Sequence, residues 1–166
     1  MYRLMDLMQL VQNPWLYVLL ITMIPWIELR GSIPAGILLG LNPVTVLIVA
    51  LAANILVIYP AFIFLDFFFK LMEKIPFMNC IINKTQRKVR PYVDKYGFIG
   101  LMLFVGVPLP GTGAYSGALA AHILGVKNKK AFLAIAAGVA IAGVLVTLMA
   151  TVFKETLGWI LQLNIL

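Results

Sequence analysis

Charged residues are scarce in this chain of 166 residues, and so are the side chains that most often bind metals. Asp, Glu, Lys and Arg make up 11% of the sequence, whereas hydrophobic residues make up 63%. A soluble domain places charge on about a quarter of its residues. The chain therefore lacks the polar surface that a protein needs in water, and the sequence predicts one integral membrane domain over residues 1–166.

Cysteine and histidine each occur once, which excludes several kinds of site. Cys80 alone forms no intrachain disulfide, and His122 alone cannot build a multi-histidine metal centre. The sequence also contains no recognisable Ser-His-Asp set or pair of catalytic carboxylates. We therefore expect no enzyme activity, no metal and no cofactor.

Basic residues outnumber acidic ones by 13 to 6, and many of them cluster near the middle of the chain. In membrane proteins such clusters mark loops that face the cytoplasm and anionic lipids. The pattern predicts a cytoplasmic loop over residues 70–96 of a multi-pass protein, with membrane lipids rather than nucleic acid as partners. The cluster consists of Lys70, Lys74, Lys84, Arg87, Lys88, Arg90 and Lys95.

Two uncharged stretches, Val44–Leu65 and Ala131–Phe153, are long enough to cross a bilayer. A helix needs about 20 residues to span a hydrocarbon core about 30 Å thick. The sequence therefore predicts two transmembrane helices, the first with a kink at Pro60 near its end.

Two further apolar stretches are interrupted by proline and glycine. Residues 97–126 carry no charge but are broken at Val107–Gly113, where two prolines remove backbone donors and the glycines favour non-helical dihedral angles. Gly97–Val107 and Ala114–Gly125 each have roughly the ten residues that cross half a bilayer. The apolar residues before and after Glu28–Pro34 form a second such stretch. Each stretch is predicted to be a re-entrant hairpin, which enters and leaves the membrane on one face.

Charge placement gives the two hairpins opposite orientations. If the loop 70–96 is cytoplasmic, the lysines at 127, 129 and 130 fall on the same side, as the positive-inside rule prefers. The predicted fold is all-α with two inverted repeats, residues 1–69 and 97–166, each a re-entrant helical hairpin followed by a transmembrane helix. The first dozen residues add an amphipathic interfacial helix. Transporters with such repeats bind substrate near the midplane, between broken helices.

A second interpretation of the N-terminal part is open at this stage. Leu7–Ile27 is also uncharged and is long enough for an ordinary transmembrane helix. Glu28 and Arg30 would then lie at the membrane interface, and Ala35–Leu41 would form a surface segment.

Glu28 and Arg30 are the first candidates for a binding site. Ionised side chains at membrane depth are costly and usually face a cavity or a partner. Desolvation favours the protonated form of a carboxyl group, which suits proton binding, whereas a neighbouring arginine opposes this effect. Arginine binds phosphate or carboxylate through two parallel hydrogen bonds. The alternative is a structural ion pair, or a pair that reaches the lipid headgroups.

Gly111-Thr112-Gly113 is the second candidate. Backbone N–H groups beside glycines can form an anion-binding concavity, aided by the positive end of a half-helix that starts near Ala114. Tyr115 and Ser116 would add hydroxyl groups in the first turn of that helix. The alternative is a tight turn that allows close packing of the hairpins.

Several other residues fit helix packing better than chemistry. His122 is interpreted as a hydrogen-bonded packing residue on an apolar half-helix. Asn54 and Thr147 are interpreted as polar contacts between helices, with a position in the cavity as the alternative. Small residues at close-contact spacing also suit a homodimer. These are Gly36, Gly40, Gly113, Gly117 and those in the run Ala134–Gly143.

Two motifs resemble the signatures of a known family. Glu28-Leu29-Arg30-Gly31-Ser32-Ile33-Pro34 and Pro108-Leu109-Pro110-Gly111-Thr112-Gly113-Ala114-Tyr115-Ser116-Gly117 are similar to those of the prokaryotic small multidrug export family. That family is similar in architecture to the DedA and VTT membrane proteins, which are implicated in moving lipids, including polyprenyl phosphates. The resemblance implies opposed re-entrant hairpins, a transport role and a prokaryotic cell membrane. The site residues it suggests are Glu28, Arg30, Gly31, Ser32, Pro34, Pro108, Pro110, Gly111, Thr112, Gly113, Tyr115 and Ser116.

The predicted function is a transporter or lipid translocase with a midplane site between the two hairpins. The expected substrate is an anionic or phosphate-bearing amphiphile, with Glu28 binding a coupling proton and Arg30 gripping the anion together with the backbone of Gly111–Gly113. Export of hydrophobic cations is the alternative that the family name suggests, with Trp15, Trp26 and Tyr115 supplying aromatic rings. A non-transporting assembly factor or an enzyme is a weaker alternative.

Overall fold

The structure is a computed structural model that describes residues 13–72, 95–109, 111–126 and 128–163. Within these residues the chain forms six helices and no strand. Several predicted features lie outside the described residues. They are the interfacial helix in the first dozen residues, most of the basic loop, Pro110 and Lys127.

Two long helices confirm the predicted transmembrane spans and extend them at both ends. Helix α4 runs over Pro43–Met72 and α7 over Asn128–Leu163. Both contain a strongly apolar stretch longer than the roughly 20 residues that cross a bilayer. Pro60 cannot donate a backbone hydrogen bond to the preceding turn, yet α4 continues through it to Met72.

Large apolar side chains cover the outer faces of both long helices. Leu56 and Phe67 of α4 are each 70% exposed, and Met149 of α7 is 64% exposed. Exposed apolar surface on this scale is unfavourable in water and suits contact with lipid tails. Together with the apolar lengths of α4 and α7, this surface marks the chain as a membrane protein.

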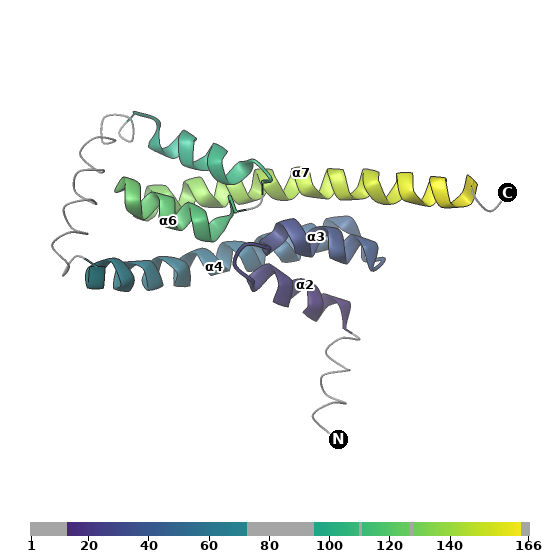
Figure 1. The fold of residues 1–166 in the computed structure, drawn as a ribbon, viewed down its shortest axis with the longest axis horizontal. Coiled ribbons are helices and arrows are strands. Elements are labelled where there is room, and N and C mark those ends of the chain that lie inside the picture. The colour runs from purple at the N-terminus through teal and green to yellow at the C-terminus, as the bar shows by residue number, and fades with distance from the viewer. Residues whose placement is uncertain (1–12, 73–94, 110, 127, 164–166) are drawn as a thin grey trace, which may run out of the picture. The chain divides into compact units, whose positions relative to one another are not determined.

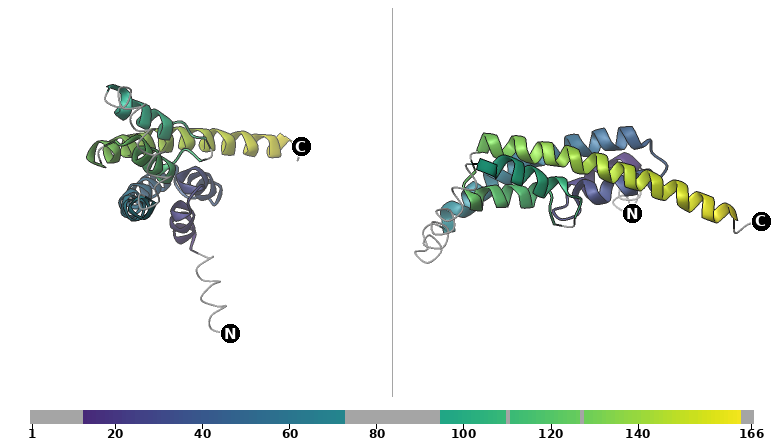
Figure 2. Two further views of the ribbon diagram at one scale, coloured as in Figure 1. Left: turned by 60° about the vertical axis from the view of Figure 1, so that its left-hand side comes forward. Right: turned by 90° about the horizontal axis from the view of Figure 1, so that it is seen from above.

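Four short helices occur in two pairs. Helices α2, Pro14–Met23, and α3, Glu28–Leu38, form the first pair and lie side by side in every view (Figures 1 and 2). The second pair consists of the helix Lys95–Gly106 and α6, Ala114–Leu124. At 1.5 Å per residue each helix is about 15–18 Å long, which is roughly half a bilayer. The break predicted at 107–113 is confirmed.

The position predicted for the first break is wrong. The segment Glu28–Pro34 lies inside α3, and the chain turns at residues 24–27 instead. Trp26 and Glu28 have φ angles of +84° and +50°, and the left-handed backbone at these two positions lets the chain change direction between α2 and α3. Pro34 removes only one hydrogen bond from α3, and its ring keeps a helical φ.

The alternative of one spanning helix over Leu7–Ile27 is also wrong. Helix α2 starts after Asn13, whose backbone is extended and whose side chain accepts a hydrogen bond from the N–H of Trp15. The helix stops at Met23, so it has 10 residues and cannot cross a bilayer.

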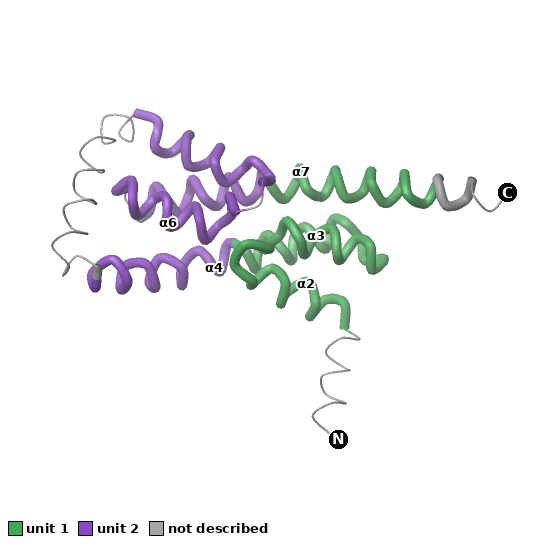
Figure 3. The backbone as a smooth tube through the Cα atoms, in the orientation of Figure 1, with its two compact units in different colours: residues 1–54, 142–166 green, residues 55–141 purple. Residues whose placement is uncertain are grey.

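The chain divides into two compact units, and each long helix contributes to both (Figure 3). The first unit, residues 1–54 and 142–166, contains α2, α3, the start of α4 and the end of α7. The second unit, residues 55–141, contains the rest of α4, the helix Lys95–Gly106, α6 and the start of α7. Each unit therefore combines one pair of short helices with a segment of each long helix.

Glycine allows close helix contacts in the first unit. A Cβ added at Gly36 of α3 would lie 2.9 Å from Val18 Cγ2 on α2 and 3.0 Å from Val46 Cγ1 on α4. One added at Gly143 of α7 would lie 2.9 Å from Leu47 Cδ1 on α4. The predicted role in helix packing is therefore confirmed for Gly36 and Gly143. It is wrong for Gly40, where an added Cβ would meet nothing within 4 Å and the positive φ marks a turn residue instead.

The second unit uses glycine for a closer approach, between backbones. A Cβ at Gly138 of α7 would lie 2.6 Å from the carbonyl oxygen of Met102 and 2.7 Å from Val105 Cβ. A Cβ at Gly117 of α6 would lie 2.6 Å from Val105 Cγ2. The helix Lys95–Gly106 therefore packs directly against α7 and α6.

A lysine near the end of α7 caps α3. Lys154 Nζ donates a hydrogen bond of 2.9 Å to the carbonyl oxygen of Ile37, in the last turn of α3. Carbonyl groups at a helix C-terminus lack helical donors and carry partial negative charge, so a lysine there is stabilising. This contact joins segments 117 residues apart in the sequence.

Replacing Lys154 tests this cap. Lys154→Met keeps most of the side chain but removes the ammonium group, so we expect a loss of about 1 kcal/mol. The midpoint of thermal unfolding in detergent should fall by about 2–4 °C. Lys129→Met, an exposed position at the other end of α7, is the control. Equal midpoints for Lys154→Met and Lys129→Met would show that the cap does not stabilise the fold.

Alanine at two glycines of α7 tests the backbone contact. At Gly138 the new methyl group meets a carbonyl oxygen of another helix, so we expect destabilisation of roughly 1–3 kcal/mol. At Gly158 nothing lies within 4 Å, and alanine should stabilise the helix by up to about 1 kcal/mol. Thermal unfolding of both variants measures the difference. Equal effects would contradict the close approach at Gly138.

Candidate functional site

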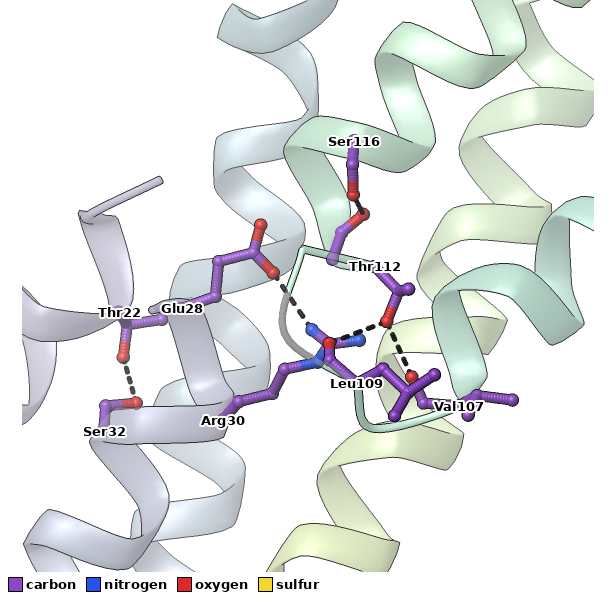
Figure 4. A network of polar contacts seen from close by, with 9 residues as sticks. Thr22, Glu28, Arg30, Ser32, Val107, Leu109, Thr112 and Ser116 are labelled. Carbon is purple, nitrogen blue, oxygen red and sulfur yellow. Dashed lines mark hydrogen bonds and ion pairs between the residues drawn. The ribbon is translucent and has the colours of Figure 1, made fainter. Parts of the chain in front are cut away.

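Glu28 and Arg30 form a buried ion pair in the first turn of α3 (Figure 4). Arg30 Nη1 lies 3.3 Å from Glu28 Oε2, and their side chains are 10% and 3% exposed. Residues two apart on a right-handed helix point to different sides. The positive φ of Glu28 redirects its side chain, so the pair can form within one short turn.

The ion pair presents two different chemical groups at one end of a half-length helix. Burial of two charges costs desolvation free energy, which a well-placed opposite charge offsets. Arginine can in addition bind an oxyanion through parallel hydrogen bonds. The site therefore places a cation and a carboxylate side by side in the first turn of α3.

Ser32 on α3 joins the first two short helices through a hydrogen bond to α2. Its hydroxyl oxygen lies 2.6 Å from that of Thr22 on α2, and both residues are fully buried. Thr22 Oγ1 also lies 2.7 Å from the carbonyl oxygen of Val18. Because a hydroxyl has one proton, Thr22 donates to the carbonyl and accepts from Ser32. Thr22 was missed by the sequence analysis, and only its pairing with Ser32 across the hairpin reveals it.

Gly31 and Pro34 complete the first motif within α3. The side chain of Ile27 closely covers the α-carbon of Gly31, and Pro34 is half-buried in the middle of the helix. Both residues therefore contribute to the shape of the helix pair.

Thr112 closes the turn between the helix Lys95–Gly106 and α6 (Figure 4). Its hydroxyl oxygen lies 2.7 Å from the carbonyl oxygen of Val107 and 2.9 Å from that of Leu109. The N–H of Thr112 also donates to the carbonyl of Leu109, at 3.3 Å. Gly111 has a φ of +84°, which a residue with a side chain would rarely adopt. The turn therefore satisfies several of its own backbone groups.

The remaining residues of the second motif flank this turn. Pro108 is half-buried, and Gly113 precedes the first turn of α6, with no side chain capping that helix end. Tyr115 and Ser116 are half-buried in the first turn, and the Ser116 hydroxyl donates to the carbonyl of Gly113 at 3.2 Å. The structure thus places Glu28, Arg30 and Gly31 in the first turn of α3, with Ser32 and Pro34 further along that helix. The described candidates of the second motif lie in the turn before α6 and in its first turn.

Asn54 is a buried polar residue that the sequence analysis assigned to helix packing. It is fully buried on α4, and neither Oδ1 nor Nδ2 has a hydrogen-bond partner in the part of the chain that the structure describes. Unsatisfied buried amides are rare in folded proteins. The signal in the sequence was a single amide within an uncharged apolar helix.

His122 behaves as the predicted packing residue. Its Nε2 lies 3.3 Å from Asp66 Oδ1 on α4, and its ring lies 4.6 Å from that of Phe69. Among the described residues no group of three or more His, Cys, Asp or Glu side chains could hold a metal ion.

Comparison with known proteins assigns the chain to a family. Residues 28–145 match the family described as "Putative small multi-drug export protein". The match begins at Glu28 and includes α3, α4, both turn-flanking helices of the second pair and the first half of α7. No curated protein and no solved structure matches the chain. Because the match covers well over half of the sequence, the protein belongs to the small multi-drug export family of membrane proteins.

Proposed function

We propose that this protein carries an anionic, phosphate-bearing amphiphile across the membrane together with a proton. The observation that supports this function is the Glu28–Arg30 ion pair, buried in the first turn of a helix too short to cross a bilayer. Charged groups at such a position are costly and serve transport in many membrane proteins. Membership of an export family agrees with a transport role.

Each pair of short helices is proposed to be a re-entrant hairpin, with its turn near the middle of the bilayer. The lengths of α2, α3 and α6 support this, since 10 or 11 residues cover about half of the hydrocarbon core. The hairpins would enter from opposite faces as inverted repeats. The cluster of basic residues in 70–96, with Lys129 and Lys130, supports a cytoplasmic location for the second hairpin's open end.

Charge balance links the anion to the proton. Glu28 and Arg30 together are neutral, and adding an anion to them leaves an uncompensated negative charge in a low-dielectric site. Protonation of Glu28 restores neutrality and removes its competition for the guanidinium group. Arg30 can then hold two oxygens of a phosphate in parallel hydrogen bonds. The anion and the proton would therefore bind together and cross together.

Export of hydrophobic cations is the second candidate, favoured by the description of the family. A buried carboxylate such as Glu28 would attract a cation, and aromatic rings near it would add cation–π attraction. Arg30 at 3.3 Å from the same carboxylate opposes this function, because it already neutralises Glu28 and repels a second cation. The two functions therefore predict opposite effects of removing Arg30: anion transport should slow, whereas cation transport should become faster.

Transport in proteoliposomes tests the anion function. With a fluorescent alkyl phosphate as probe, Arg30→Ala should lower the rate roughly tenfold or more, because a charged hydrogen bond of about 1.5–3 kcal/mol is lost. Arg30→Lys should be intermediate, since an ammonium group cannot make the bidentate contact. Acidifying the side that holds the probe should speed the wild type but not Glu28→Gln.

The same variants decide between the two candidates. Lys130→Met, on an exposed position of α7, controls for a general loss of charge. If Arg30→Ala instead moves a lipophilic cation faster than the wild type does, the cation function holds. Wild-type rates for the alkyl phosphate in both Arg30→Ala and Glu28→Gln would exclude the proposed mechanism.

We further propose that the two hairpin turns share one site, as the opposed orientations predict. Cysteines at Arg30 and Thr112, in a Cys80→Ser background, should then be joined by a bifunctional thiol reagent long enough to replace a bound phosphate, since a direct disulfide would leave no room for the ligand. A protease site placed in residues 73–94 would show the two halves of the chain linked after cleavage. Val44→Cys with Thr112→Cys is the control that should stay unlinked. Equal linkage, or none in either pair, would mean that the turns share no site.

A further inference from the structure

The amide of Asn54 is the one fully buried polar group of α4 without a hydrogen-bond partner in the described part of the chain. It has an acceptor, Oδ1, and a donor, Nδ2, and both are buried and unsatisfied. Removing such a group from water without a new partner is unfavourable, and lipid offers none. A buried amide of this kind calls for a partner other than the described residues, and a bound ligand is one such partner.

The helix register places Asn54 at the level of Glu28. Helices α3 and α4 are joined by a short turn and run in opposite directions, and Gly36 of α3 packs against Val46 of α4. Eight residues before Gly36 is Glu28, and eight residues after Val46 is Asn54. At 1.5 Å per residue both lie about 12 Å along their helices from the Gly36 contact, so they share one level in the first unit.

The direction of the Asn54 side chain follows from the neighbours of α4. At about 100° per residue, Asn54 points about 80° away from Val46, which faces α3. Leu47 and Leu51, which face Gly143 of α7, lie about 100° and 140° from Val46 on the same side. Asn54 therefore points between α3 and α7, beside the end of α3 that carries Glu28 and Arg30.

From this arrangement we infer that Asn54 is a third ligand-binding residue and that the site selects a phosphate monoester. This inference rests on the proposed anion function. The Nδ2 group would donate to a phosphate oxygen, while Oδ1 would accept from a P–OH group. Arg30 and the positive end of α3 would hold the remaining charge.

A phosphate diester fits this set of groups less well. It has no P–OH, so it leaves Oδ1 of Asn54 buried and unpaired. Sites that hydrogen-bond a particular ligand group discriminate strongly against ligands that lack it, because their own polar atoms then stay unsatisfied. The side chain of Asn54 would thus distinguish two classes of lipid-like phosphate that carry the same charge of −1.

Competition between two probes tests the inference. Dodecyl phosphate and its methyl ester, a monoester and a diester with the same chain, compete with the fluorescent alkyl phosphate for purified wild-type protein at a pH where both carry one negative charge. We expect the monoester to bind at least tenfold more tightly. In Asn54→Leu the preference should shrink to less than threefold. Thr147→Val removes a hydroxyl that bonds to Gly143 within its own helix, and it should keep the wild-type preference.

Stability without ligand gives a second readout. Asn54→Leu removes two unsatisfied buried atoms, so its thermal midpoint in detergent should equal or exceed that of the wild type. A lower midpoint with an unchanged monoester preference would overturn the inference and make Asn54 a packing residue. Equal binding of monoester and diester by the wild type would overturn it without any variant.

The outcomes also separate this inference from the function on which it rests. If Arg30→Ala abolishes binding of both probes while Asn54→Leu keeps the monoester preference, the anion function is supported and the ligand-binding role of Asn54 is wrong. If the wild type binds neither probe, the anion function and the role of Asn54 are both wrong.

Discussion

A turn of the backbone inside a membrane leaves N–H and C=O groups that lipid cannot satisfy. Both turns between the short helices provide part of these partners from their own atoms. The N–H of Ile24 donates to the carbonyl of Ile21, and those of Ile27 and Glu28 donate to the carbonyl of Ile24. In the second turn the hydroxyl of Thr112 contacts the carbonyl oxygens of Val107 and Leu109. The rest of each unit packs around these turns.

Close packing is the second requirement, since a short helix has too few contacts to hold itself in place. Glycine provides it by letting helices approach where a side chain would collide, at Gly36 in the first unit and at Gly117 and Gly138 in the second. Polar contacts reinforce the first unit: the Thr22–Ser32 pair joins α2 to α3, and Lys154 joins α7 to the end of α3. Helix α3 is thereby held by contacts with three neighbouring segments, α2, α4 and α7.

The buried charged residues Glu28 and Arg30 both lie in the first turn of α3. Glu28 and Arg30 compensate one another's charge, which makes their burial tolerable. Asn54 lies at the same level with an amide that no described residue satisfies. A neutral ion pair beside an unsatisfied amide contributes little to stability, because a well-packed apolar set would be at least as stable. The proposed binding function would give these groups a role that stability does not.

The sequence by itself determined the membrane class, the two long helices and the break at Val107–Gly113. The scarcity of charge, the length of the apolar stretches and the two prolines are features of neighbouring residues, so their effects do not depend on tertiary contacts. It misplaced the first turn, because Glu28–Pro34 has the composition of a helix breaker. The buried side chains of Leu29, Ile33 and Ile37 keep that segment helical all the same.

Only the tertiary structure decided which polar residues meet. The Thr22–Ser32 pair depends on how α2 and α3 pack across their turn, and the Lys154 cap joins segments 117 residues apart. The burial of Asn54 likewise depends on the helices packed around α4. A polar residue in an apolar stretch looks the same in sequence whether a neighbouring helix satisfies it or not. Its role depends on which residues of the neighbouring helix lie against it, and only the packed fold determines those residues.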